Sequence, residues 1–296
     1  MDSQTGGRRG ISILIINPNT STHMTEALKP IIGALNYSDV EFDYFTAPAN
    51  EAVPLPDGLV IDGVPSINSG EDSVKSALHC RPFVLPLVPK YDGFLVACYS
   101  AHPLVGILKE EIGNIEAECL SSSSSRRKFV TGIFEASIST SLVLISCFHL
   151  LDDQEFTKIQ GAETFGIVTT GSVWKAELSK AVTDMLVRPA SNPEEQGQTN
   201  RFAGVETTGL TAVELHETPP EEVKRRMVEA TERLLQNTPS RVGAICLGCA
   251  GMAGMEEAVR AGCVRVYGRE YGKSVRIVDG VVAGVGMLVS TCKAGF

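Results

Sequence analysis

The sequence lacks a hydrophobic run long enough to cross a bilayer. Its longest apolar stretch, around residues 142–151, is about half as long as a membrane helix needs to be. It also lacks an excess of basic residues, because 26 Lys and Arg stand against 35 Asp and Glu, a formal net charge of −9. Nucleic acids and anionic membrane surfaces attract basic patches. The composition therefore argues against both partners, although backbone N–H groups can still bind a small anion locally.

Several common signatures are missing as well. The chain has no GxxxxGK[ST] phosphate loop, no GxGxxG dinucleotide fingerprint and no GxSxG serine turn. Eight cysteines in 296 residues are too sparse for a disulfide scaffold, which favours reduced thiols. Residues 1–10 are polar and are typical of a disordered lead-in rather than a signal peptide. We therefore expect a soluble, cytoplasmic protein.

What the sequence does contain is an alternation of strand and helix patterns. Residues 11–16 (ISILII) form a continuous β-branched run, which is typical of a buried parallel strand. Capping side chains follow at residues 17–21, and apolar residues then recur at helical spacing from Met24 onward. Further buried strands are predicted at residues 94–97, 165–168 and 242–247. This alternation predicts an α/β fold with mostly parallel sheets flanked by helices.

The two halves of the chain follow the same plan. Ile13 precedes Cys98 by 85 positions, and Gly166 precedes Cys249 by 83. We interpret this as a duplication that gives two pseudo-symmetric lobes with an active site in the cleft between them. The first lobe is expected at residues 11–128, with a C-terminal helix at 279–296 packing back on it, and the second at 129–278.

Two stretches interrupt this plan. Residues 120–127 (LSSSSSRR) are of low complexity and predict a mobile loop between the lobes. Residues 144–161 have poor helical phasing and lie where a short connection would suffice. They fit a real insertion and a gene-model artefact equally well.

Cys98 and Cys249 are the residues best placed for chemistry. Each follows a predicted strand and precedes a predicted helix, and ligand sites in parallel sheets lie at the carboxyl ends of strands. A helix N-terminus can lower a thiol pKa from about 8.5 to between roughly 3.5 and 7.5. Two such thiols on opposite faces of one carbon could remove a proton and return it from the other side, with no cofactor. The alternative is that both are inert, buried cysteines.

Two further interpretations remain open around these cysteines. Cys246 and Cys249 form a CxxC pattern, which can mark a zinc site or a redox pair. No second pair of ligands supports structural zinc, and Cys246 falls inside the predicted strand rather than at an exposed helix start, which argues against a redox pair. We therefore expect no metal site. His102 stands four residues after Cys98 and could orient a substrate, tune the thiol or be an exposed residue at a helix start.

The segments around these residues resemble a known family. Residues 16–21 (INPNTS) and 247–252 (LGCAGM) are similar to motifs of the aspartate/glutamate/hydantoin racemase superfamily, hydantoin (allantoin) racemase branch. Residues 131–136 (TGIFEA) and 165–171 (FGIVTTG) match further family segments. The resemblance covers about residues 11–290, apart from the two interrupted stretches. Residues 98–103 (CYSAHP) lack the Asp-Pro of bacterial members and look like the fungal members linked to allantoin use.

The resemblance implies a cofactor-independent isomerase, and a homo-oligomer, acting on a small molecule. Its reaction would be inversion of the C5 centre of a 5-substituted hydantoin, with allantoin favoured and with Cys98 and Cys249 as the two acid/base residues. The implied substrate-binding residues are Asn17, Tyr99, Ser100, His102, Thr169, Thr170, Ala250 and Gly251. A maleate isomerase or arylmalonate decarboxylase relative and a catalytically inactive ureide-binding paralogue remain as alternatives.

Overall fold

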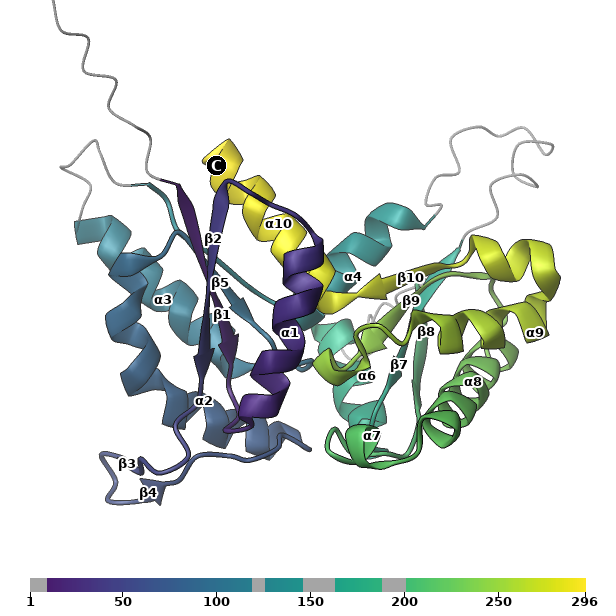
Figure 1. Cartoon of the computed structure of the whole chain (residues 1–296), viewed down its shortest axis with the longest axis horizontal. Helices are drawn as coiled ribbons and strands as arrows, with labels where there is room; N and C mark the ends of the chain where they lie inside the picture. Colours follow the sequence, from purple (N-terminus) through teal and green to yellow (C-terminus); the bar gives the residue numbers. More distant parts are fainter. Residues whose placement is uncertain (1–9, 119–125, 146–162, 188–200) are drawn as a thin grey trace, which may run out of the picture.

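The computed structural model describes residues 10–118, 126–145, 163–187 and 201–296 (Figure 1). The expected lead-in at 1–10 lies outside these ranges except for Gly10, as does most of the serine-rich loop at 120–127. Of the expected insertion at 144–161, only residues 144 and 145 are described.

The strands form two parallel four-stranded sheets, one in each lobe (Figure 1). The first sheet has the order β2 (Val40–Thr46), β1 (Ile11–Asn17), β5 (Gly93–Val96), β6 (Phe129–Gly132). The second has the order β8 (Phe202–Thr207), β7 (Thr164–Thr169), β9 (Val242–Gly248), β10 (Arg276–Asp279). Corresponding strands occupy corresponding positions, which confirms the predicted pair of pseudo-symmetric α/β lobes.

Helices flank both sheets, and a small hairpin extends from the first lobe. The helices are α1 (Thr22–Ala34), α2 (Gly70–Val84), α3 (Pro103–Glu118), α4 (Ile133–Leu144), α6 (Val173–Leu186), α7 (Glu214–Glu217), α8 (Pro220–Gln236), α9 (Glu256–Ser274) and α10 (Gly280–Ala294). Two 3₁₀ turns, η1 (Leu85–Lys90) and η3 (Ala250–Met252), and the antiparallel pair β3 (Val53–Pro54) and β4 (Val60–Ile61) complete the described elements. None of the helices within the described ranges has the length and hydropathy of a membrane span.

Local sequence explains where the helices begin. The side chain of Ser21 accepts a hydrogen bond from the Met24 N–H at the start of α1, and Ser69 does the same for Asp72 at the start of α2. Asp279 accepts from two N–H groups, those of Val281 and Val282, at the start of α10. Such side-chain caps satisfy N–H groups that have no partner inside the helix.

The expected lobe boundary after residue 128 is one strand too early. β6 pairs in parallel with β5, with Phe94 opposite Val130, so residues 129–132 complete the first sheet. The chain then exchanges helices between the lobes, since α4 packs against β9 and β10 while α10 packs against β5 and β6. A strand pattern in the sequence does not show with which edge of which sheet the strand will pair. The pairing of β6 with β5 was therefore not predicted.

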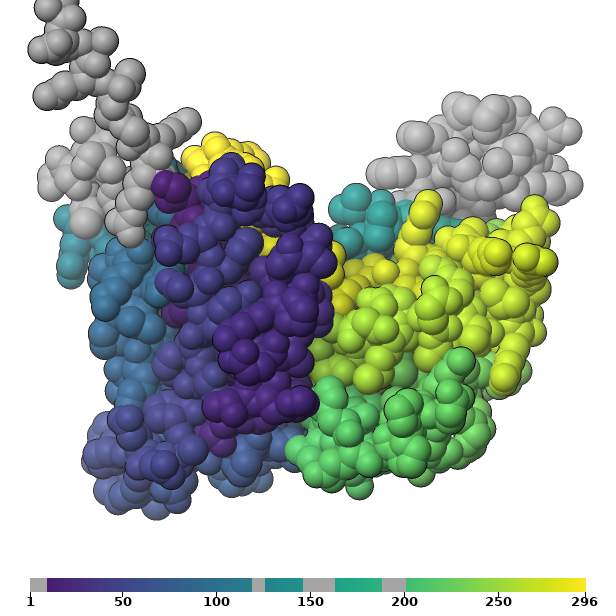
Figure 2. Space-filling view, in the orientation of Figure 1, coloured from purple at the N-terminus to yellow at the C-terminus, as the bar shows by residue number. Residues whose placement is uncertain are grey.

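The exchanged helices join the two lobes through a shared core. One continuous cluster of buried apolar side chains includes Ile15 of β1, Ile138 of α4, Val285 of α10 and Ile167 of β7. α1 of the first lobe also contacts η3 of the second, and Figure 2 shows the purple residues of the first lobe directly against the yellow and green residues of the second. The residues that follow β5 and β9 are thereby brought toward one another.

Candidate active site

Cys98 and Cys249 line one small cavity between the lobes. Its volume is about 40 Å³, and both cysteines are half-buried when the whole residue is considered. The first lobe contributes Asn19, Met24, Ile67, Ala97, Cys98 and Tyr99, and the second contributes Thr170, Trp174, Ala212, Gly248, Cys249 and Ala250. The cavity therefore receives residues from the carboxyl-terminal ends of strands in both sheets, as the fold class leads one to expect.

Cys98 is held by a short loop rather than by a helix. The Ala97 N–H donates to the Ile16 carbonyl at 2.8 Å, which ties the end of β5 to β1. The Cys98 Sγ lies 3.5 Å from the Ser100 Oγ, which in turn lies 3.2 Å from the Ser73 Oγ of α2. α3 begins at Pro103, where a helix was expected, so residues 99–102 separate Cys98 from the helix N-terminus.

Cys249 occupies the turn between β9 and η3. Its Sγ accepts a hydrogen bond from the Gly251 N–H at 3.4 Å. A Cβ on Gly251 would lie 3.0 Å from the His216 Nε2 and 3.6 Å from the Cys249 Sγ, so a larger residue here would require the His216 side chain to move. The turn is short, so the Cys249 thiol interacts with nearby backbone N–H groups and does not lie at the N-terminus of a long helix.

Burial governs the electrostatics of both thiols. It raises the pKa of Cys98 to about 12, against the lowering effect of the hydrogen bond to Ser100. It raises the pKa of Cys249 to about 11, against the lowering effect of the Gly251 and Met252 N–H groups. The expected lowering of both pKa values is therefore wrong for this closed cavity, because desolvation outweighs one or two hydrogen bonds. Both thiols are protonated at neutral pH.

The two cysteines also influence one another. A negative charge on Cys249 raises the pKa of Cys98 further, and so does the buried carboxyl group of Glu135 at the start of α4. Two thiolates are therefore disfavoured relative to one thiolate and one thiol. A thiolate facing a thiol is the combination that a base and an acid on opposite sides of one carbon require.

Three of the eight predicted substrate-binding residues line the cavity: Tyr99, Thr170 and Ala250. Gly251 and Ser100 instead contact the sulfur atoms of Cys249 and Cys98. Both therefore support the thiols without forming the wall of the cavity.

Asn17 does not line the cavity, although its neighbour Asn19 does. Asn17 is buried, and its Nδ2 donates to the Asn19 Oδ1, the Ser21 carbonyl and the Thr25 Oγ1 at 3.1, 2.9 and 3.1 Å. The Asn19 Oδ1 also accepts from the Ser21 N–H at 2.9 Å. Within the described ranges the Asn19 Nδ2 makes no hydrogen bond, and Asn19 lines the cavity.

His102 is a buried structural residue. Its Nδ1 accepts from the Leu104 N–H at 3.3 Å, so its Nε2 carries the hydrogen and donates to the Ser76 Oγ at 3.2 Å. The Ser76 Oγ donates onward to the Pro18 carbonyl at 2.8 Å. Burial lowers the pKa of His102 to about 4 and keeps it neutral. Its role is to tie α2 to the loops that follow β1 and β5.

Thr169 is likewise a structural residue and does not line the cavity. It is buried, and its Oγ1 donates to the Gly248 carbonyl at 2.5 Å, which fixes the end of β9 one residue before Cys249. A Cβ on Gly248 would approach the Thr169 Cβ to 2.5 Å and the Val168 carbonyl oxygen to 2.9 Å. The backbone at the second cysteine therefore depends on glycine.

Replacing Gly248 with alanine is expected to lower the free energy of unfolding by about 1–3 kcal/mol, the range for overpacking a well-packed site. Urea denaturation followed by circular dichroism measures the change. Gly171→Ala is the matched control, because a Cβ there meets no atom within 4 Å. Equal stabilities for the two variants would contradict the close approach of β7 and β9.

Several lining residues were missed by sequence analysis. Trp174 is the only tryptophan in the chain and follows Thr170 by four residues, which is a signal that could have identified it. Asn19 lies in the same INPNTS motif as Asn17. Ile67 and Ala212 come from loops. Residues 63–67 (GVPSI), which end at Ile67, resemble a family segment only weakly, and nothing in the sequence context of Ala212 marks it.

Comparison with known proteins places these features in a family. The Asp/Glu/Hydantoin racemase family profile matches residues 13–288. An uncharacterised protein from Schizosaccharomyces pombe is 30% identical over 280 residues, 95% of this chain and 91% of the relative.

Solved structures share the fold. The allantoin racemase from Pseudomonas fluorescens gives a TM-score of 0.65 at 22% identity, covering 97% of this chain and 92% of that one. The allantoin racemase from Klebsiella pneumoniae gives 0.64 at 22% identity, covering 97% and 89%. The match of the family profile to nearly the whole chain shows that this protein belongs to the Asp/Glu/hydantoin racemase family.

Proposed function

We propose that the protein is a cofactor-independent racemase that inverts the C5 centre of a neutral 5-substituted hydantoin, with allantoin as the first candidate. Cys98 and Cys249 are its acid/base pair. The observation that carries this proposal is that thiols from opposite lobes line the same cavity. The substrate loses its C5 proton to the thiolate on one face, and the planar intermediate that results takes a proton from the thiol on the other face, which inverts the centre.

The cavity offers donors for the charge that develops on the substrate. The C5 hydrogen of a hydantoin lies beside a carbonyl group, so removing it places negative charge on that oxygen. Preorganised donors aimed at such an oxygen lower the barrier. The Asn19 Nδ2 is one candidate, and the backbone N–H groups of Tyr99 and Ala250, which directly follow the two cysteines, are two more.

The charge of the cavity supports a neutral substrate. Among the residues that the structure describes, no Asp, Glu, Lys or Arg lines the cavity. A dicarboxylate would enter with two charges and find no side chain of opposite charge, and desolvating unpaired charges is costly. A hydantoin ring needs only hydrogen bonds and an apolar wall, which Met24, Ile67 and Trp174 supply. This observation favours a hydantoin over the substrates of maleate isomerases and arylmalonate decarboxylases.

The size of the cavity requires the lobes to part. At about 10–15 Å³ for each water, a volume of about 40 Å³ holds only a few waters. Contacts between the lobes would have to break, among them the edge-to-face pair of His23 on α1 and His216 on α7, whose ring centroids are 5.3 Å apart. Closure around the substrate would then exclude water from the two thiols.

Hydrogen–deuterium exchange tests the proposed function. Incubated in D₂O with either enantiomer of allantoin or of 5-benzylhydantoin, the protein is expected to incorporate deuterium at C5 while optical rotation is lost. No cofactor is added. Mass spectrometry and polarimetry follow the two processes.

Maleate and phenylmalonate, as dicarboxylates, serve as comparison substrates and are expected to remain unchanged. Isomerised maleate or carbon dioxide released from phenylmalonate would contradict the assignment. Thermal stabilisation by allantoin without any exchange at C5 would identify a ureide-binding protein instead.

A further inference from the structure

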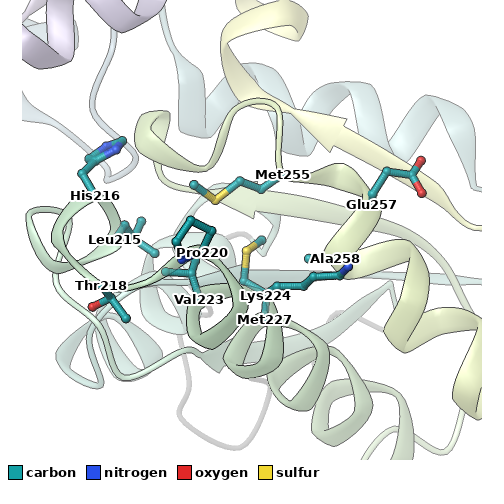
Figure 3. A pocket seen from close by; sticks show the side chains of 10 residues that line it. All are labelled: Leu215, His216, Thr218, Pro220, Val223, Lys224, Met227, Met255, Glu257 and Ala258. Atoms are coloured by element: carbon teal, nitrogen blue, oxygen red, sulfur yellow. The ribbon is translucent and has the colours of Figure 1, made fainter.

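A second, larger pocket lies in the second lobe, away from the cavity between the lobes. Its volume is about 440 Å³, and residues from α7, α8 and α9 line it (Figure 3). This volume falls in the range of small-molecule sites, about 300–1,000 Å³. The cavity between the lobes holds only about 40 Å³. The second pocket is therefore the one already open to a ligand of moderate size.

The walls of this pocket are mostly apolar. Val223 and Met227 of α8 face Met255 and Ala258 at the start of α9, and Leu215 closes one end. Figure 3 shows the side chains of Met227 and Met255 at the centre of the pocket. Methionine side chains adapt to ligands of irregular shape, as they do at promiscuous binding surfaces. An apolar ligand body therefore fits these walls.

One cation at the edge of the pocket is available to a ligand. Lys224 lines the pocket and makes no ion pair or hydrogen bond within the described ranges, whereas the neighbouring Arg225 and Arg226 both pair with Glu222. In Figure 3 the Lys224 side chain runs along the pocket toward Ala258, while the carboxylate of Glu257 points away from the methionines. The polar group that complements this edge is an anion.

The pocket is also connected to the turn that carries Cys249. The Met255 N–H donates to the Met252 carbonyl at 3.0 Å, and the Met252 N–H donates to the Cys249 carbonyl at 3.0 Å. His216, another lining residue, lies against Gly251 on the other side of the same turn. A ligand that touches Met255 and His216 would restrain the turn from both ends.

We propose that this pocket is a second ligand site for a small organic anion with an apolar body, and that its occupant restrains the turn that holds Cys249. The ligand is a monoanion whose charge pairs with Lys224 and whose body lies against Met227 and Met255. Binding here is separate from turnover, so the site can be tested without any assumption about the reaction between the lobes.

Two fluorescent probes of nearly the same shape test the binding. 8-Anilinonaphthalene-1-sulfonate carries a sulfonate that N-phenyl-1-naphthylamine lacks. The native protein is expected to bind the sulfonate at one site, about fivefold more tightly than the neutral probe, which is the scale of one exposed charge pair. Lys224→Glu should remove this preference. Lys180→Glu is the matched control, because Lys180 pairs with Asp184 on α6, outside the pocket.

A pocket-filling variant locates the site. Ala258→Phe is expected to abolish binding of both probes. Because Ala258 is buried and this variant could fail to fold, Lys224→Glu, a change at an exposed residue, keeps the test decisive. An unchanged preference for the sulfonate in Lys224→Glu, or the absence of single-site binding to the native protein, would overturn the proposal.

Alkylation by iodoacetamide, followed residue by residue with mass spectrometry, measures the connection to the turn. Saturation with 8-anilinonaphthalene-1-sulfonate is expected to slow alkylation of Cys249 by about fivefold, a typical coupling between two sites. Cys292 on α10, which is also half-buried, serves as the internal control and should react at an unchanged rate. Equal rates at Cys249 with and without the bound probe would refute the coupling.

Discussion

The Cys98→Ser and Cys249→Ser variants are each expected to lower kcat for racemisation by about 10²–10⁴-fold, the usual contribution of a general acid or base. A serine hydroxyl fills nearly the same space as a thiol, but it does not ionise at neutral pH. Both thiols line the cavity and each serves one face of the substrate, so the loss of either blocks inversion in both directions. Polarimetry with each enantiomer of allantoin measures the effect.

Isotope exchange separates the roles of the two cysteines. In each variant the remaining thiol still faces one side of C5 and can exchange the hydrogen on that side without inverting the centre. Cys98→Ser and Cys249→Ser are therefore expected to incorporate deuterium into opposite enantiomers. Full racemisation in either variant would show that one cysteine serves both faces and would overturn the two-base assignment.

Cys246→Ser is the matched control. Cys246 lies in β9, three residues before Cys249, and is buried, with its Sγ 3.1 Å from the Ser141 Oγ. It does not line the cavity between the lobes. Racemisation by this variant should equal that of the native protein. A loss as large as that of Cys249→Ser would mean that the strand, rather than the thiol, is what the substitution disturbs.

The parts of this structure that follow from local rules could be predicted from the sequence. The buried run at residues 11–16 became β1, and the cap at Ser21 starts α1 as the side-chain pattern indicated. The duplication was also visible, since Cys98 and Cys249 follow corresponding strands of two sheets with the same strand order. Ligand sites lie at the carboxyl ends of parallel strands, and the family resemblance implies a site between the lobes, so both cysteines could be assigned to one cavity from the sequence.

The parts that depend on burial and on a few residues of loop could not be predicted in this way. Asn17 and Asn19 both lie in the INPNTS motif, yet only Asn19 lines the cavity. The side chain of Asn17 instead makes hydrogen bonds within the loop that follows β1. His102 stands next to the predicted helix start, but it faces Ser76 inside the lobe. The pKa values of Cys98 and Cys249 depend on how far the packing of the two lobes buries the thiols, and no sequence motif indicates the extent of that burial.

Slow alkylation at neutral pH is the second large effect that follows from the structure. With the pKa of Cys249 raised to about 11, against about 8.5 for a free cysteine, the thiolate fraction at pH 7 is reduced on the order of 10²-fold. Because the folded-state pKa lies above the free value, the thiolate fraction rises about tenfold per pH unit up to and beyond pH 9. Iodoacetamide labelling of Cys249 between pH 6 and 10, read by mass spectrometry, should show this continued rise.

The chain unfolded in urea is the reference for this profile, since its cysteines should level off near pH 8.5, the value of a free thiol. The kcat/KM of racemisation is expected to rise with pH in the same way as the labelling of Cys249 in the folded protein, because kcat/KM reports the ionisation of groups in the free enzyme. The double variant Cys98→Ser/Cys249→Ser supplies the blank for spontaneous racemisation at alkaline pH. Levelling near neutral pH in both measurements would mean that the thiols react from an open form in which water or an N–H group stabilises the thiolate. The closed cavity would then be the resting form of the protein rather than the reactive one.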